Sequence, residues 1–292
     1  MKVIKKFLKR ILPRARAIQD KIVHRDEYLK IISIRRALKC QGLLELYNRL
    51  SSIVPDISNQ YTTFKINSEY YRTKVRAEHA FQISLVQDSL RLLKLEDKRP
   101  LTIVDIGDSC GTHLEYLKGL YKNINTLSVN LDPEAIRRIR EKEIDAICAR
   151  AEELNRYSRD ADIYLSFEMI EHLTDPIGFL YKLSHGTECK AFVITVPYIE
   201  QSRIGLRFIR DNQKKDVRSE SVHIFELSPF DWRLIFKYAG WDVIYDRVYL
   251  QYPQKGPLSL TKNYWKKIDY EGFYGAVLSR NFSWSSLYKD WL

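Results

Sequence analysis

The sequence predicts an α/β protein whose open, mostly parallel sheet carries helices on both faces. From residue 101 onward, short apolar runs of strand type alternate with segments of helical spacing. Residues that favour helix starts and stops separate these runs, among them Pro133, Ser228 and Gly240. A chain of 292 residues, 45% of them hydrophobic, can also bury a sizeable core.

Seven strands and their helices are expected in order. The strands cover residues 101–106, 125–130, 144–149, 161–167, 190–196, 241–249 and 272–280. The helices cover residues 112–121, 133–142, 175–184 and 228–240, the last with Ser228 as its N-cap and Gly240 as its C-cap. A long helix over residues 68–95, capped by Ser68, precedes the first strand.

A basic helical extension comes before the sheet. Residues 1–39 hold thirteen Lys/Arg and three acidic residues, so they carry +10 of the net charge of +11. Over residues 2–12 the apolar and basic residues take opposite sides of a helix, which Pro13 should end or kink. Such a basic amphipathic segment, residues 1–24, can bind an anionic membrane surface, dock on its own domain or contact a partner. Helix is expected to continue over 25–50, and 51–60 to form a linker. We therefore divide the chain into an extension with linker, residues 1–60, and a domain, residues 61–292, with its core at about 98–280.

Composition excludes several classes of function. No apolar run approaches the roughly 18 residues of a membrane span. The four cysteines have no CxxC pairing, which argues against a zinc site and against a disulfide framework. We expect a cytoplasmic protein. Binding of residues 1–24 to the membrane would place it peripherally at the inner face. Since the chain after residue 39 is nearly neutral, no nucleic acid is expected as a partner.

The turn "VDIGDSCGTH", residues 104–113, follows the first strand, where open α/β sheets bind their ligands. Its spacing, Gly107-x-Ser109-x-Gly111, does not match the GxGxxG pattern of dinucleotide sites, and no Gly-Lys-Ser/Thr of a P-loop follows. Asp105 at the strand end suits a positively charged end of a ligand. The glycines would let the backbone approach that ligand closely.

This turn resembles the first motif of class I methyltransferases that use S-adenosylmethionine (SAM), in which the pattern is D/E-x-G-x-G-x-G. The resemblance covers about residues 100–280. Within this family, the sequence resembles the type 11 and ubiquinone-pathway members. "SFEMIEHLTDP" (166–176) resembles the fourth motif. "ITVPY" (194–198) and "HIFELSPFDWRLIFKYAGW" (223–241) resemble the fifth strand and the following helix entry. The resemblance implies a Rossmann-like, doubly wound, seven-stranded sheet and SAM as the cofactor.

The resemblance also implies which residues hold SAM. The family has an acid for the ribose hydroxyls where Asn130 stands, and Asp132 is the alternative. "ARAEEL" (149–154) resembles the segment that frames the adenine, with Arg150 in place of a common Asp. The implied cofactor-binding residues are Asp105, Gly107, Ser109, Gly111, Asn130, Leu131, Arg150, Ala151, Glu152, Phe167 and Glu168.

Transfer of the methyl group to a hydroxyl benefits from a base that takes the proton. The catalytic candidates are His172, His223 and Glu171. Glu168, Glu171 and His172 are spaced to share one face of a helical turn. In ubiquinone-pathway O-methyltransferases the matching set is associated with a metal, but the same letters occur in members without one, and we expect no metal here.

The expected function is SAM-dependent transfer of a methyl group to an oxygen of a small-molecule, sugar or lipid-linked acceptor. The loop 197–222 is rich in Arg and Lys, which suits an acceptor with phosphate or carboxylate, or a solvated surface. The aromatic tail, residues 264–292, can stack on an acceptor, pack on the domain or seal a homodimer. Two alternatives stay open: a degenerate SAM-fold scaffold without turnover, suggested by Ser109, Asn130 and Arg150, and an RNA methyltransferase.

Overall fold

A seven-stranded sheet forms the centre of the computed structural model, which describes residues 27–97, 100–157, 160–218, 221–263, 265 and 270–288. The strand order is β3-β2-β1-β4-β5-β9-β8. The strands are β1 (Leu101–Ile106), β2 (Ile124–Asn130), β3 (Asp145–Cys148), β4 (Ile163–Phe167), β5 (Ala191–Pro197), β8 (Trp241–Leu250) and β9 (Gly272–Arg280). Only the pairings of β9 with β5 and β8 are antiparallel in this sheet. The predicted seven-stranded, mostly parallel sheet is confirmed.

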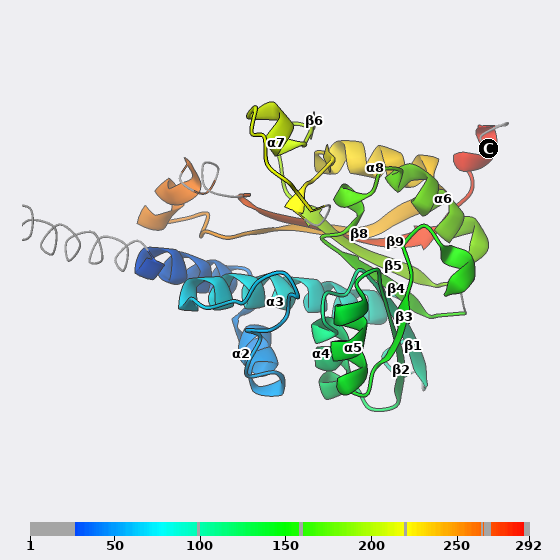
Figure 1. Ribbon diagram of the computed structural model, residues 1–292, viewed down its shortest axis with the longest axis horizontal. Helices are drawn as coiled ribbons and strands as arrows, with labels where there is room; N and C mark the ends of the chain where they lie inside the picture. Colours follow the sequence, from blue (N-terminus) through cyan, green and yellow to red (C-terminus); the bar gives the residue numbers. More distant parts are fainter. Residues whose placement is uncertain are drawn as a thin grey trace, which may run out of the picture.

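Helices cover both faces of the sheet (Figure 1). On one face lie α3 (Glu69–Leu92), α4 (Thr112–Leu120) and α5 (Pro133–Glu141), and on the other lie α6 (Pro176–Gly186) and α8 (Pro229–Tyr238). The predicted N-caps are confirmed, because Ser68 accepts a hydrogen bond from the Tyr71 N–H and Ser228 accepts one from the Asp231 N–H. The C-cap of α8 is Ala239, one residue before the predicted Gly240, and Gly240 follows it with a φ of 87°, the left-handed conformation that ends helices.

The segment before α3 does not form the single predicted helix. Residues 27–40 are helical, and a turn at 41–43 separates them from α2 (Leu44–Ile53). Gly42 has a φ of 73°, so the helix stops there and the prediction of one helix over 25–50 is wrong. The predicted amphipathic helix of residues 1–24 lies outside the described residues.

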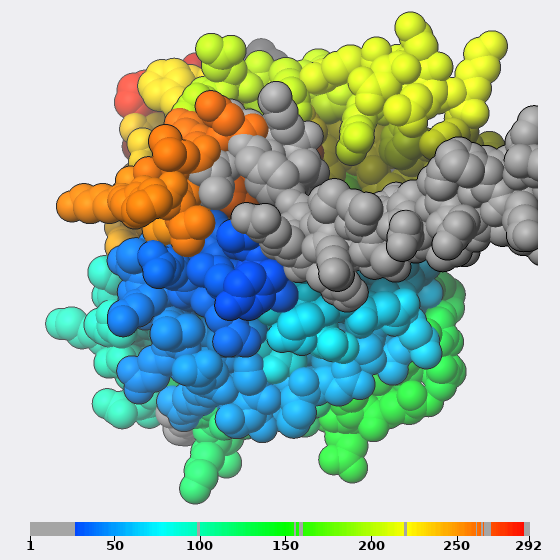
Figure 2. Space-filling model, turned by 90° about the vertical axis from the view of Figure 1, so that its left-hand side faces the viewer, coloured from blue at the N-terminus to red at the C-terminus, as the bar shows by residue number. Residues whose placement is uncertain are grey.

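The extension packs into the domain. Ile34, Leu38 and Leu50 belong to the same buried cluster as the inner side of α3 and the sheet. The Gln41 amide donates to the Leu250 carbonyl at 2.8 Å and accepts from the Leu250 N–H at 3.0 Å, which holds the start of the chain against the edge strand β8. Figure 2 shows the described start of the chain, in dark blue, beside the orange segment that follows β8. The division of the chain at residue 60 stays a prediction.

Smaller elements lie outside the main sheet. β6 (Arg203–Ile204) pairs with β7 (Phe225–Glu226), and α7 (Arg207–Arg210) lies between them in sequence. This small unit projects beyond the main sheet on the side of α8 (Figure 1). Among the described residues, no helix has the length and apolar content to cross a membrane. Of the aromatic tail, Trp265 is buried, Trp284 and Tyr288 are exposed, and Tyr264 and Trp291 lie outside the described residues.

Candidate functional site

A cavity of about 510 Å³ lies at the carboxyl ends of the parallel strands. It brings together nine of the fourteen predicted site residues: Gly107, Ser109, Asn130, Leu131, Arg150, Ala151, Glu152, Glu168 and His172. Its lining does not include Asp105, Gly111, Phe167, Glu171 or His223. Because the carboxyl ends of parallel strands meet at one edge of a sheet, loops far apart in sequence form this wall together.

Two parts of the cavity wall were not predicted from the sequence. The first is residues 61–64, where Tyr61 and Phe64 stack with their ring centroids 4.7 Å apart. The second is contributed by the β6–β7 unit and the chain around it, through Leu206, Val222 and Ile224. Both segments carry ordinary loop residues, so only the tertiary fold shows that they close over the strand ends.

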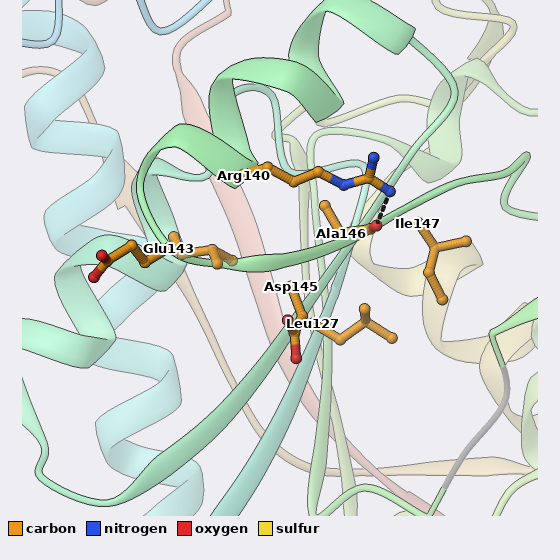
Figure 3. Close-up of a pocket in the computed structure, with 7 residues that line it drawn as sticks. Leu127, Arg140, Glu143, Asp145, Ala146 and Ile147 are labelled. Atoms are coloured by element: carbon orange, nitrogen blue, oxygen red, sulfur yellow. Dashed lines mark hydrogen bonds between the residues drawn. The ribbon is translucent and has the colours of Figure 1, made fainter.

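A second hollow of about 590 Å³ lies beside β3, at the edge of the sheet. Figure 3 shows Arg140 reaching across it, where its guanidinium donates a hydrogen bond to the Ala146 carbonyl at 2.9 Å. None of the predicted site residues lines this hollow. The candidate site is therefore the cavity at the strand ends.

The glycines of the β1–α4 turn are required by backbone shape and by close contact. Gly107 has a φ of 90°, and a Cβ on it would lie 2.6 Å from Cγ of Met169. Gly111 has a φ of 81°, and a Cβ there would lie 3.2 Å from Cγ1 of Ile139. Ser109 does not have a positive φ, so the backbone conformation at this position does not require a glycine.

Asn130 braces the turn. Its side-chain amide donates to the main-chain carbonyls of Asp108 and Ser109, at 2.8 and 3.2 Å, and its amide oxygen accepts from the Asp132 N–H at 2.8 Å. Asp132 in turn caps α5 by accepting from the Glu134 N–H at 2.9 Å. Asn130 and Asp132 both line the cavity, and both form hydrogen bonds with main-chain groups of the fold.

The segment after β3 forms the adjoining wall. Glu152 lines the cavity and its carboxylate lies 3.5 Å from Nε of Arg150. The Arg150 N–H is held by the Glu153 carboxylate at 2.9 Å. The Ala151 carbonyl accepts a hydrogen bond from the Tyr157 hydroxyl. These contacts fix the main chain of this segment while Arg150 stays largely exposed.

Asp105 lies behind the turn and not on the cavity surface. It is 1% exposed, and its Oδ2 lies 3.3 Å from Nδ1 of His113. Burial and the nearby charge of Asp108 raise the pKa of Asp105 to about 6. Burial alone would lower the pKa of His113, but the Asp105 and Asp108 carboxylates raise it to about 10. The role of Asp105 toward a ligand stays a prediction.

Glu168 marks a strained point at the end of β4. Its φ of 50° is rare for a residue with a side chain, and strain of this kind gathers at functional sites. Its side chain lines the cavity, and its Oε1 is buried with no hydrogen-bond partner among the described residues. Burial, followed by the charge of Glu171, raises the pKa of Glu168 well above its usual range.

The three catalytic candidates meet beside the cavity. Atoms of Glu171, His172 and His223 that could bind a metal all lie within 4.8 Å of one another, and the two imidazole rings meet edge to face at 4.6 Å. Glu168 is not part of this group, although the spacing predicted it on the same face as Glu171 and His172. The helical turn after Glu168 is a short 3-10 helix, η2 (Ile170–His172), which explains the difference.

Hydrogen bonds assign the tautomer of both imidazoles. Nδ1 of His172 lies 3.0 Å from the Val222 carbonyl, which can only accept, so Nδ1 donates. The Tyr270 hydroxyl donates to Glu226 at 2.6 Å, so it accepts from Nδ1 of His223 at 2.8 Å. In the neutral form both rings therefore present Nε2 as the proton acceptor.

Glu171 lies beside the histidines with no exposed surface. Neither of its carboxylate oxygens has a hydrogen-bond partner among the described residues, and Oε1 lies 3.9 Å from Nε2 of His172. Burial, together with the charges of Glu78 and Glu226, raises the pKa of Glu171 to about 8. Glu171 can therefore hold a proton at neutral pH, which makes it a candidate acid as well as a candidate base.

The basic residues of loop 197–222 do not converge on the cavity. Arg203 pairs with Glu226, and Arg207 lies 3.6 Å from Asp211. The Arg210 guanidinium donates to the Gly205 carbonyl at 3.0 Å. The cavity lining includes none of the predicted basic residues of this loop, which are Arg203, Arg207, Arg210, Lys214, Lys215 and Arg218.

Many solved structures resemble this chain over much of its length. A putative sarcosine dimethylglycine methyltransferase from Galdieria sulphuraria matches with a TM-score of 0.52 and 13% identity, over 73% of this chain and 87% of that one. The cyclase SpnF matches with a TM-score of 0.51 and 10% identity, over 85% of this chain and 96% of that one. No protein-family model and no curated protein matches the sequence. The chain has the fold of class I SAM-dependent methyltransferases, as the motifs predicted.

Proposed function

We propose that this protein is a SAM-dependent methyltransferase and that SAM binds in the cavity at the strand ends. The observation that carries the proposal is the convergence of nine predicted residues on that one cavity. They come from four loops that are separate in the sequence, and the methyltransferase motifs alone predict them. The fold alone would not carry the proposal, because SpnF, one of the solved structures that resemble this chain, is a cyclase.

SAM would lie across the carboxyl ends of β1 and β2. The Gly107 turn would receive its methionine part, because a glycine there lets main-chain N–H groups approach closely. We expect Leu131 and Asp132 to contact the ribose, and Ala151 and Glu152 to contact the adenine, since all four residues line the cavity. Asn130 would act indirectly, by holding the turn in shape.

His172 is our choice for the general base. The Val222 carbonyl holds its Nδ1–H, so the neutral ring offers Nε2 to the proton of an acceptor hydroxyl. SAM, when bound, would supply its methyl group to the acceptor oxygen, and the electron pair of the broken carbon–sulfur bond would stay on sulfur. The proton leaves the acceptor oxygen for Nε2. The chain supplies position and proton transfer.

A divalent cation is the alternative use of Glu171, His172 and His223. The donor set fits, because each imidazole donates Nδ1–H to an oxygen and can present Nε2, and the Glu171 carboxylate has no hydrogen-bond partner among the described residues. A cation there would lower the pKa of an acceptor hydroxyl. Activity that survives chelation with EDTA would support His172 acting alone. Activity lost with EDTA and restored by added Mg²⁺ or Zn²⁺ would support the cation.

The acceptor end of the cavity favours a small molecule. Leu206, Val222 and Ile224 give it an apolar wall, and Tyr61 and Phe64 add an aromatic one. The charge pattern of residues 1–24 supports a lipid- or glycan-linked acceptor and a peripheral location at an anionic membrane surface. The cysteines, which have no CxxC spacing, support a cytoplasmic location. Deletion of residues 1–24 should then reduce sedimentation with anionic vesicles, and unchanged sedimentation would remove the membrane from the proposal. We also propose a homodimer in which the aromatic tail, residues 264–292, forms the contact between the two subunits.

The decisive experiment uses labelled SAM. The purified protein is incubated with SAM labelled on its methyl group and with fractionated cell extract. Transfer of label to a small-molecule or lipid fraction is expected, with His172→Asn as the inactive control. Binding of SAM without label in any fraction would favour the degenerate scaffold instead. Label found in RNA would favour the RNA methyltransferase.

A further inference from the structure

A cluster of buried charged residues lies at the turn between β1 and α4. Its residues do not line the cavity and are not among the catalytic candidates. Asp105 and Asp108 are each 1% exposed, and His113 is 6% exposed. Nδ1 of His113 lies 3.3 Å from Oδ2 of Asp105 and 3.5 Å from Oδ1 of Asp108. Neither carboxylate has a hydrogen-bond partner among the described residues, so His113 is their shared counter-charge there.

The second ring nitrogen of His113 shows its protonation state. Nε2 lies 3.0 Å from Oε1 of Gln82 in α3. The orientation of that amide is fixed from its other side, where Nε2 of Gln82 donates to the Glu78 carboxylate at 3.4 Å and to the Thr195 hydroxyl at 3.2 Å. A carboxylate only accepts, so the amide oxygen faces His113. Nε2 of His113 must therefore carry a proton.

Nδ1 carries the second proton. It faces two carboxylates, and a bare nitrogen lone pair there would repel both. Among the described residues, a third titratable group in contact with the ring is His79 of α3, at 4.9 Å between ring centroids, and Phe167 of β4 covers another side at 4.9 Å. Burial, and then the charge of His113, lower the pKa of His79 well below its usual range, so His79 adds no charge.

We propose that His113 is a positioning residue which, as an imidazolium, holds Asp105 and Asp108 behind the Gly107 turn as a cluster with one net negative charge. This inference rests on the proposed function, since it takes SAM as the ligand beside the turn. SAM carries one net positive charge, from its ammonium, sulfonium and carboxylate groups together, so the cluster complements it. Without the imidazolium, the two buried carboxylates would repel each other, and the turn would lose its shape.

The first test needs no ligand. Nitrogen NMR on protein labelled with ¹⁵N in histidine reports whether each ring nitrogen carries a proton. The His113 signals are assigned from His113→Gln or, where that variant does not fold, from the shift caused by Asp108→Asn. Both His113 nitrogens are expected to be protonated at pH 8 in the SAM-free protein. A neutral ring at pH 8, or a stoichiometric metal ion retained at the cluster, would overturn the proposal.

The second test measures SAM affinity by calorimetry at pH 8. His113→Gln is expected to weaken SAM binding at least tenfold. The double variant His113→Gln with Asp108→Asn restores a single net negative charge, and its affinity is expected to return to within about threefold of wild type, a coupling that a purely structural role would not produce. His79→Gln, at the neighbouring buried histidine, is the matched control and should change affinity little. A double variant as weak as His113→Gln would overturn the charge role.

The two tests separate this inference from the proposed function. Wild-type protein that shows an imidazolium by NMR but does not bind SAM would contradict the proposed function and leave the cluster as a feature of the fold. Wild-type protein that binds SAM with a neutral His113 would contradict this inference and leave the proposed function intact.

Discussion

At the scale of single residues, Ser109 tests how closely the turn must follow the methyltransferase pattern. Its backbone is not in the left-handed region, and its side chain lines the cavity. We therefore expect Ser109→Gly to change the dissociation constant for SAM by less than about threefold, measured by calorimetry. A gain of about tenfold, or about 1.4 kcal/mol, would mean that the hydroxymethyl group obstructs the cofactor.

His172 tests the proposed proton transfer. His172→Asn keeps an N–H donor in the side chain, as the Nδ1–H facing the Val222 carbonyl is in wild type, but nothing takes the place of Nε2. We expect kcat to fall by about two to four orders of magnitude, the usual contribution of a general base. SAM affinity should be unchanged, because the fold of the loop is kept. A variant with unchanged kcat would exclude His172 as the base.

Among the elements, the contact between the end of the first described helix and β8 can be tested by one side chain. Gln41 satisfies both main-chain groups of Leu250 on an edge strand. Gln41→Ala should lower the free energy of unfolding by about 1–3 kcal/mol, because the two groups lose their partner. The measurement is urea unfolding, with the exposed Gln201→Ala as the control. An effect no larger than that of the control would show that the extension contributes little to the domain.

The sequence predicted elements better than contacts between them. The strand over residues 101–106 and the caps at Ser68 and Ser228 were predictable because the apolar spacing and the capping chemistry are local. The helix break at Gly42 was missed, since an isolated glycine does not always end a helix. In the site, the convergence of the strand-end loops followed from the fold class.

Other parts of the site could not be predicted from local patterns. Residues 61–64 and Leu206 reach the cavity only through tertiary packing. His223 joins Glu171 and His172 because β7 pairs with β6 and returns the chain to the end of β4, where the Ile224 N–H donates to the Glu171 carbonyl at 2.8 Å. The network from His113 through Gln82 to Thr195 crosses three elements and has no sequence motif.

For the whole molecule, His113 makes stability depend on pH. Its pKa in the fold is about 10, above the ordinary 6.5, so its contribution is present in full below pH 6.5 and declines as the pH rises through about 10. The difference in unfolding free energy between wild type and His113→Gln should therefore shrink over that range in urea titrations. For His79, whose pKa is lowered, the corresponding difference should instead shrink as the pH falls below 6.5. A difference for His113 that is constant from pH 6 to about 10 would contradict an imidazolium.

The central claim, that the cavity at the strand ends binds SAM through the Gly107 turn, is tested most directly by calorimetry on three proteins. Wild type should bind SAM at one site per chain. Gly107→Ala should bind it at least about tenfold more weakly, because Ala is strained at a φ of 90° and its Cβ would meet Met169. Gly186→Ala, where a Cβ meets nothing within 4 Å, should bind like wild type. No heat of SAM binding to folded wild-type protein, or equal affinity in Gly107→Ala, would contradict the claim.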